Sequence, residues 1–452
     1  MQAEWANSVS SSHVLQNPQN PQKPAAARGS GRVRWWIVWT LFFSTAINYI
    51  SRQTFSVLAP LITAQYHLSH ADLAKILGAF QIAYAVTWLV GGTLLDALGT
   101  RVGLAVAVVF WSVVNILTGF ASSVFGFAFF RFLLGIGEGF NWPGASKTVA
   151  EWFPSDERSI AVAIFDSGSS VGGAVAALAV PLIALRFGWR VAFVISGLLG
   201  FVWLFVWLRV YYPLDRHPRV TPEEIAYIRA GQDVSVPSTQ SPRRRWAGLL
   251  RDPNLWAIVL GRALTDPIWW FYVFWLPQYL SDARGFSLHR IALFAWMPFV
   301  AADVGNFTGG LISGYLIRRG VSVVRARVWV CVFSSVPILA GIPAARVHSV
   351  YAALALVCFA LWGYASWSTM GLTLPSDLFP QDVVATVTGV SGLAAGLVGA
   401  GFTFAVGILV DRFSYGPAFV AAGLLPLLAT ACLVLLLREP SKTAPVREQA
   451  AV

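Results

Sequence analysis

The sequence has few charged residues and fewer cysteines. Charged side chains make up 12% of its 452 residues, against roughly a quarter in ordinary soluble domains. The three cysteines lie far apart within apolar runs, so the sequence supports neither a disulfide framework nor a zinc site. The six histidines fall in tails, loops or the ends of apolar segments, which argues against an imidazole proton relay in the middle of a membrane.

The usual motifs of soluble catalysis are also missing. The sequence contains no P-loop, no dinucleotide fingerprint and no HExxH motif. Its one extended polar stretch, residues 214–253, is short for a catalytic or signalling domain. These absences argue against an enzyme, and we expect no cofactor.

Apolar segments, by contrast, fill most of the chain, of which 56% is hydrophobic. A helix of about 20 apolar residues crosses the ~30 Å hydrocarbon core of a bilayer. Segments of that length lie near residues 35–60, 72–95, 101–121, 124–148, 159–185, 190–212, 254–280, 289–316, 325–346, 348–371, 385–410 and 416–437. We therefore expect an all-α membrane protein with twelve transmembrane helices.

The net charge of +11 could indicate nucleic-acid binding, but Lys and Arg also collect in the cytoplasmic loops of membrane proteins. Here the basic residues favour the loops and tails on the side of the N-terminus. That side carries the arginines of the central loop and Arg101, Lys147, Arg158, Arg318, Arg319, Arg325 and Arg327. We expect both termini to be cytoplasmic and no nucleic-acid partner.

The two sets of six segments are related copies. Trp152-Phe-Pro-Ser-Asp recurs 226 positions later as Leu378-Phe-Pro-Gln-Asp, and Arg186-Phe recurs at the same spacing as Arg412-Phe. Such a repeat predicts two six-helix bundles. The expected organisation is a disordered cytoplasmic tail at 1–33, a bundle at 34–212, a cytoplasmic linker at 213–253, a second bundle at 254–437 and a cytoplasmic tail at 438–452.

Seven charged residues lie deep inside the expected spans, away from the span ends. They are Arg52, Arg131, Arg262, Glu138, Asp166, Asp266 and Asp303. A charge in the bilayer is costly, so each is a candidate functional residue. Arg131 and Glu138 are seven residues apart, about two helical turns, and therefore share a face.

Two motifs carry a family resemblance. Gly92-Thr-Leu-Leu-Asp96-Ala-Leu-Gly-Thr-Arg101 and Arg131-x3-Gly-x-Gly resemble the loop 2–3 and fourth-helix signatures of the major facilitator superfamily. Tyr49-Ile-Ser-Arg52 and Gly-Glu138-Gly-Phe-Asn-Trp-Pro resemble its anion:cation symporter branch, and within it the bacterial hexuronate transporters.

The resemblance implies proton-coupled uptake of a sugar carboxylate across a bacterial inner membrane by alternating access, with the proton as coupling ion and a substrate site between the bundles. We expect a monomer. Two positions depart from the pattern. Ser51 stands where several family members have aspartate, and Asp166 stands where a neutral residue is expected.

Arg52 is the candidate anchor for the substrate carboxylate, because a guanidinium offers two parallel hydrogen bonds and keeps its charge. Tyr49 lies one turn earlier, where its hydroxyl could hold a sugar hydroxyl. The alternative is a permanent structural pair between Arg52 and Glu138. Arg131 fits substrate contact and helix-to-helix hydrogen bonding equally.

Glu138 is the candidate proton carrier. Burial favours a protonated carboxylic acid, whereas a nearby arginine favours the carboxylate, so the proton affinity of Glu138 would switch as the anion occupies or leaves Arg52. A structural ion pair is the alternative. Asp166 is a candidate second proton site. Arg262 and Asp266, one turn apart, are expected to neutralise each other, and Asp303 to serve helix packing.

Further contacts can be assigned by residue type. Candidate substrate contacts are Gln81, Tyr84, Ser169 and Ser391, and candidate gating residues on the cytoplasmic side are Gly92, Asp96 and Arg101. Trp142, Trp269 and Trp270 are possible aromatic walls of the site.

Three alternatives to hexuronate uptake stay open. One is uptake of another sugar acid, such as an aldonate or glucarate, or of another carboxylate. Another is efflux by antiport, although residues 168–173 lack the proline typical of the fifth span in such antiporters. The last is a sensor that binds a sugar acid without transporting it.

Overall fold

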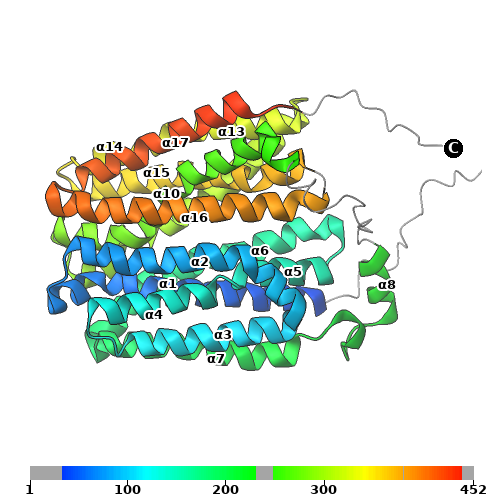
Figure 1. The fold of residues 1–452 in the computed structure, drawn as a ribbon, viewed down its shortest axis with the longest axis horizontal. Coiled ribbons are helices and arrows are strands. Elements are labelled where there is room, and N and C mark those ends of the chain that lie inside the picture. Colours follow the sequence, from blue (N-terminus) through cyan, green and yellow to red (C-terminus); the bar gives the residue numbers. More distant parts are fainter. Residues whose placement is uncertain (1–32, 231–247, 380, 440–452) are drawn as a thin grey trace, which may run out of the picture.

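The computed structural model describes residues 33–230, 248–379 and 381–439, which form two bundles of long helices side by side (Figure 1). Most of the two predicted tails, and residues 231–247 of the predicted linker, lie outside these ranges. The first bundle comprises α1 (Val33–Tyr66), α2 (His70–Leu98), α3 (Thr100–Thr118), α4 (Val124–Glu138), α5 (Asn141–Trp152), α6 (Ser155–Phe187) and α7 (Trp189–Val210). The second comprises α10 (Pro253–Asp282), α11 (Leu288–Phe294), α12 (Met297–Arg318), α13 (Val323–Ile338), α14 (Gly341–Ala344), α15 (Val350–Leu378), α16 (Gln381–Arg412) and α17 (Gly416–Leu436).

The described chain makes the twelve predicted crossings. Ten helical segments are long and apolar enough to cross a membrane, and in three of them two helices follow each other: α4 with α5, α11 with α12, and α13 with α14. The other two crossings, α1 and α10, have 34 and 30 residues but carry buried charged side chains, which lower their hydropathy. The first helix of each repeat is thus its most polar one.

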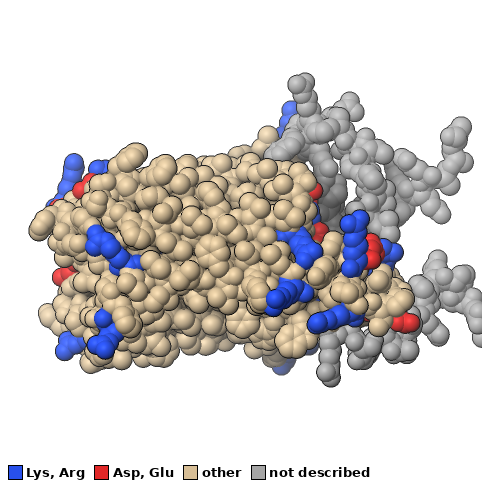
Figure 2. Space-filling view, turned by 90° about the horizontal axis from the view of Figure 1, so that it is seen from below, with Lys and Arg blue, Asp and Glu red and all other residues tan. Residues whose placement is uncertain are grey.

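The surface fits a bilayer. A broad band without Lys, Arg, Asp or Glu crosses the face in Figure 2, and basic residues gather toward both ends. We call the end where α1 begins and α17 ends the terminal face, and the opposite end the distal face; they lie to the right and left of Figure 1. Each long helix runs between these two faces.

Small residues let the helices approach closely. A Cβ atom on Gly172 of α6 would lie 2.3 Å from the carbonyl oxygen of Ala46 on α1. Between the two bundles, a Cβ on Gly396 of α16 would lie 2.4 Å from Cβ of Ala85 on α2. Such seams are typical of membrane helices.

The linker folds against the first bundle at the terminal face. After a 3-10 turn at Leu214–Arg216, α8 (Pro222–Ala230) buries Ile228 and Glu224. Arg34 at the start of α1 donates from NH1 to Glu224 at 3.1 Å and from Nε to Glu157 at 2.8 Å. The linker therefore contains a short helix that is anchored to the first bundle by ionic hydrogen bonds.

Candidate functional site

Arg52 and Glu138 form the centre of a buried polar cluster. Arg52 lies in α1, is 1% exposed, and donates from Nε to Oε2 of Glu138 at 3.0 Å and from NH2 to Asn48 at 3.0 Å. Glu138 is the last residue of α4 and is fully buried. The ion pair considered for these residues is therefore present. For a buried pair of this kind, the cost of removing two charges from water offsets much of the attraction between them, so the pair adds little net stability.

Aromatic rings surround the Arg52 guanidinium. Its central carbon lies 4.5 Å from the ring centroids of Tyr49 and Tyr84, 5.2 Å from that of Phe80 and 5.5 Å from that of Trp270. Ring faces attract a desolvated cation. Trp270 belongs to the second bundle, so Arg52 lies between the bundles and not against lipid. The predicted contacts Tyr49 and Tyr84 are brought together here.

Arg131 adds a second cation. It is fully buried, donates from NH1 to the carbonyl oxygen of Arg52 at 3.1 Å, and lies 4.5 Å from the ring of Phe80. Its Nε and NH2 atoms have no partner among the described residues. Glycines allow this placement, since a Cβ on Gly135 would lie 2.4 Å from the carbonyl oxygen of Phe80. Two guanidiniums are therefore buried at this centre, and only that of Arg52 forms an ion pair with Glu138.

Several buried polar atoms at this centre lack partners among the described residues. They are Oε1 of Glu138, both side-chain amide atoms of Gln81, Nδ2 of Asn48 and the hydroxyl of Ser51. Each buried unpartnered polar group costs roughly 1–3 kcal/mol. These free donors and acceptors could bind the polar groups of a ligand. Because they lie beside an excess of positive charge, the ligand that fits them is polar and anionic. The predicted contact Gln81 belongs to this set.

The second bundle contributes a neutral pair. Arg262 of α10 donates from NH2 to Asp266 at 2.9 Å and from NH1 to the hydroxyl of Ser391 on α16 at 3.0 Å. Its guanidinium lies 5.6 Å from the ring centroid of Trp88 on α2, so the pair faces the first bundle. The expected mutual neutralisation of Arg262 and Asp266 is confirmed, and the predicted contact Ser391 holds the arginine.

Asp166 lies on the other side of the cluster, in α6. It is close enough to Asp303 of α12 for their charges to interact, and Asp303 is within hydrogen-bonding reach of Ser170. The two acids belong to different bundles. The sequence led us to expect only a packing role for Asp303, but the structure also places it near a second acid, Asp166. Ser169, the neighbouring predicted contact, is half-buried and shows no hydrogen bond among the described residues.

The predicted gating residues lie at the terminal face of the first bundle. Asp96 at the end of α2 pairs with Lys147 of α5 at 2.6 Å. Arg101 donates to the carbonyl oxygen of Leu208 and lies 4.1 Å from the ring centroid of Tyr212. Gly92 is half-buried, and a Cβ atom at this position would meet nothing within 4 Å. The contacts of Asp96 and Arg101 join helices and loops within one bundle.

At the distal face, hydrogen bonds of His70 join the two bundles, and sequence reasoning did not predict them; we call this set of bonds the lock of His70. His70, which follows the N-cap Ser69 at the start of α2, lies between two aspartates of the second bundle. Its Nδ1 is 2.7 Å from Asp411 and its Nε2 is 2.8 Å from Asp282. Gln278 also donates to Thr63 across the bundles, at 3.3 Å. Nothing local marks His70, because its partners are 341 and 212 residues away.

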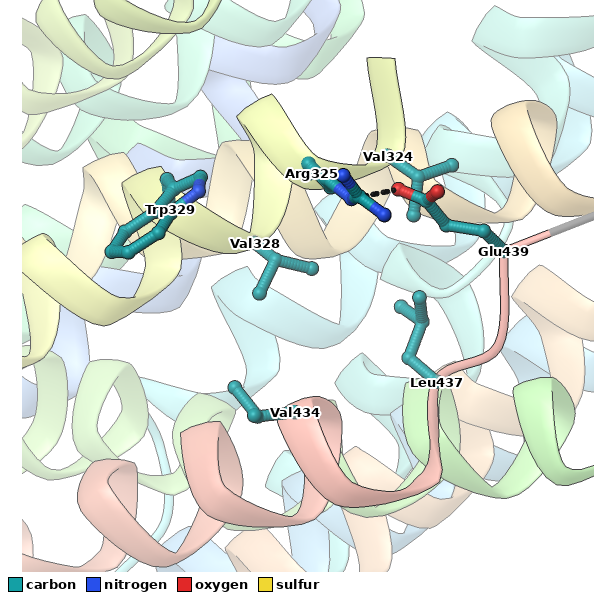
Figure 3. A pocket seen from close by; sticks show the side chains of 7 residues that line it. All are labelled: Val324, Arg325, Val328, Trp329, Val434, Leu437 and Glu439. Carbon is teal, nitrogen blue, oxygen red and sulfur yellow. Dashed lines mark ion pairs between the residues drawn. The ribbon is translucent and has the colours of Figure 1, made fainter. Parts of the chain in front are cut away.

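A groove on the outside of the second bundle is a poorer candidate. It lies between α13 and the end of α17, has a volume of about 410 Å³, and holds the ion pair of Arg325 with Glu439 (Figure 3). Its walls come from one bundle only, whereas the cluster around Arg52 joins both. The described residues hold no group of metal-ligating side chains.

Comparison with known proteins agrees with this architecture. Residues 41–403 match the family model described as Major Facilitator Superfamily. The hexuronate transporter of Escherichia coli (strain K12) is 33% identical over 401 residues, covering 88% of this chain and 92% of that protein. The galacturonate transporter of Dickeya chrysanthemi is 35% identical over 279 residues, covering 62% of this chain and 81% of that protein.

Two further similarities extend the comparison. The probable galactarate/D-glucarate transporter of Bacillus subtilis (strain 168) is 30% identical, covering 83% of each chain. Among solved structures, a bacterial homolog of the human lysosomal transporter Spinster, in an inward-facing and occupied conformation, superposes with a TM-score of 0.68 at 20% identity. It covers 90% of this chain and 96% of that one, and it bears on the fold alone.

Proposed function

The chain belongs to the Major Facilitator Superfamily, and from this premise we propose that it is a proton-coupled symporter for the uptake of a sugar acid, in the first place a hexuronate. As a member of this family it is a multi-pass membrane transporter and not an enzyme. We further propose that the protein is a monomer in a bacterial inner membrane, with both termini in the cytoplasm.

The observation that carries the proposal is the balance of charge at Arg52. Of the two buried guanidiniums, that of Arg52 pairs with Glu138, whereas that of Arg131 bonds only the carbonyl oxygen of Arg52 among the described residues and has no ion pair. A carboxylate ligand offsets the surplus, and charge-assisted hydrogen bonds to arginine are among the strongest available for this purpose. The free polar atoms of Gln81 and the rings of Tyr49 and Tyr84 suit the hydroxyls and C–H faces of a sugar.

Coupling to protons follows from competition for Arg52. A proton that binds Glu138 neutralises the carboxylate and releases the Nε donor of Arg52. The substrate carboxylate then takes the vacated position, so the net charge of the site stays unchanged. Proton and substrate thus favour each other's binding, and both bias the same conformational equilibrium.

Two features support the choice of substrate and direction. The hexuronate and galacturonate transporters named above share most of their length with this chain. The basic residues favour the terminal face, which the positive-inside rule assigns to the cytoplasm. The lock of His70 then lies on the outer side of the membrane.

Purified full-length protein in proteoliposomes tests the proposal. An inward proton gradient should drive accumulation of galacturonate or glucuronate, and a protonophore should abolish it. Aldonates and neutral sugars serve as comparison substrates. Accumulation of an aldonate alone would move the proposal to that sugar acid, while binding without accumulation would favour a sensor. Accumulation driven only by an outward proton gradient would indicate proton antiport and would favour efflux.

A further inference from the structure

A helical ladder on α10 places Asp266 against the first bundle. Arg262, Asp266, Trp270 and Phe274 recur every four residues and therefore share one face of the helix. On either side of Asp266 this face contacts the first bundle, because Arg262 lies 5.6 Å from the ring of Trp88 and Trp270 lies 5.9 Å from that of Tyr84. Asp266 accordingly faces the same interface.

One oxygen of the Asp266 carboxylate has no hydrogen bond among the described residues. Oδ2 accepts from Arg262 and the hydroxyl of Tyr364 lies near the carboxylate, whereas Oδ1 is buried without such a bond, and the residue is 8% exposed. The hydroxyl of Thr265, next to it, is buried and unpartnered too. The second bundle thus offers a free acceptor in a site that is otherwise neutral.

Asp266 lies one helical turn from a residue that contacts the cationic centre. Trp270 lies 5.5 Å from the Arg52 guanidinium, and Asp266 precedes it by one turn, about 6 Å along the helix axis. A six-carbon acid bound to Arg52 by its carboxylate therefore extends its far carbon to the level of Asp266.

Resting on the proposed function, we propose that Asp266 determines specificity: it accepts a hydrogen bond from a hydroxyl at the far end of a sugar monocarboxylate and excludes dicarboxylates. A hydroxyl there satisfies Oδ1, whereas a second carboxylate places two like charges in a buried site. Charge opposition of this kind is an effective means of rejecting a near relative. The substrate class is thus uronates and aldonates, not aldarates.

The test compares galacturonate with galactarate, which carries a second carboxylate where galacturonate has its aldehyde carbon, closed in the ring as a hemiacetal. In proteoliposomes, unlabelled galactarate should inhibit galacturonate counterflow at least tenfold more weakly than unlabelled galacturonate does. Asp266→Asn should reduce this preference at least tenfold, because it leaves the Arg262 charge unopposed. Asp377→Asn, which removes the partner of Arg327 elsewhere in the second bundle, should leave the preference unchanged.

Ligand-induced thermal stabilisation gives the same comparison without transport and keeps the wild-type result decisive should Asp266→Asn fail to fold. Equal inhibition and equal stabilisation by both acids in the wild type would overturn the role of Asp266 while leaving sugar-acid transport intact. An unchanged preference in folded Asp266→Asn would also overturn it. A protein that neither binds nor exchanges any sugar acid would overturn both this inference and the proposed function.

Discussion

Oε2 of Glu138 lies 3.0 Å from Nε of Arg52, while Oε1 of the same carboxylate has no partner among the described residues. One oxygen is thus committed to the cation and the other is free to take a proton. This division gives the carboxylate two functions in one site: it opposes Arg52 when ionised and leaves it free when protonated.

Glu138→Gln should separate exchange from accumulation. Glutamine resembles the protonated acid in shape and charge, so the variant should bind and exchange galacturonate in counterflow at a rate near that of the wild type. It should not concentrate galacturonate under an inward proton gradient, because no proton is carried. Accumulation above equilibrium by the variant would assign the coupling to another acid.

Arg52→Lys should impair binding although the charge is kept. A lysine cannot reach Glu138 and Asn48 together as the guanidinium does, and loss of a charge-assisted hydrogen bond costs about 1.5–3 kcal/mol, or roughly a 10- to 150-fold rise in the KM of uptake. Arg284→Lys, at a partly buried arginine bonded to carbonyl oxygens within the second bundle, is the matched control. Equal KM values in both variants would remove Arg52 from the substrate site.

Asp166→Asn tests for a second proton. Asp166 and Asp303 are half-buried and lie close enough for their charges to interact, and like charges at close range oppose joint ionisation. If Asp166 carries a proton, uptake by the variant should continue with one proton fewer per substrate and a shifted pH dependence. Measurement of the reversal potential gives the stoichiometry. An unchanged stoichiometry would leave Asp166 with a structural role.

The sequence predicted the local parts of this site better than the distant ones. The crossings follow from the length of apolar segments, and the pairing of Arg262 with Asp266 follows from their spacing of one turn. The cost of an intramembrane charge was enough to single out Arg52 and Glu138. These inferences need only one helix or one helical pair.

Contacts between distant segments could not be predicted in this way. The hydrogen bond from Arg131 to the carbonyl oxygen of Arg52 joins residues 79 apart in the sequence, and that from Arg262 to Ser391 joins residues 129 apart. Such pairings depend on how helices rotate and dock, which a single sequence without aligned relatives does not encode in any local pattern. The partner of Asp96 was left unspecified for the same reason.

The lock of His70 should control opening of the distal face. Both ring nitrogens lie within hydrogen-bonding distance of aspartate oxygens, and a neutral imidazole has only one N–H, so the imidazolium satisfies both aspartates at once. His70→Ala removes these bonds and should shift the equilibrium toward a state open at the distal face. We expect about 1–2 kcal/mol for these partly exposed bonds.

Spin labels at Lys75 and Arg412, in a chain whose native cysteines are replaced by serine, would report the separation of α2 and α16 at this face. His70→Ala should lengthen the distance distribution, and so should raising the pH of the wild type, because deprotonation removes one of the two ring N–H donors and the positive charge between the aspartates. His289→Ala, at an exposed histidine on α11, should leave it unchanged. A distribution insensitive to both changes would contradict the lock.

Gly172 should be required for the position of α1. A Cβ at Gly172 would lie 2.3 Å from the carbonyl oxygen of Ala46, so Gly172→Ala must push α1 away from α6. Overpacking of this kind costs about 1–3 kcal/mol, and it also displaces the helix that carries Tyr49 and Arg52. The variant should therefore melt at a lower temperature in detergent and bind galacturonate more weakly. Gly310→Ala is the matched control, since its Cβ would meet nothing within 4 Å and alanine favours the helix; equal melting temperatures in both variants would mean that α1 yields without cost.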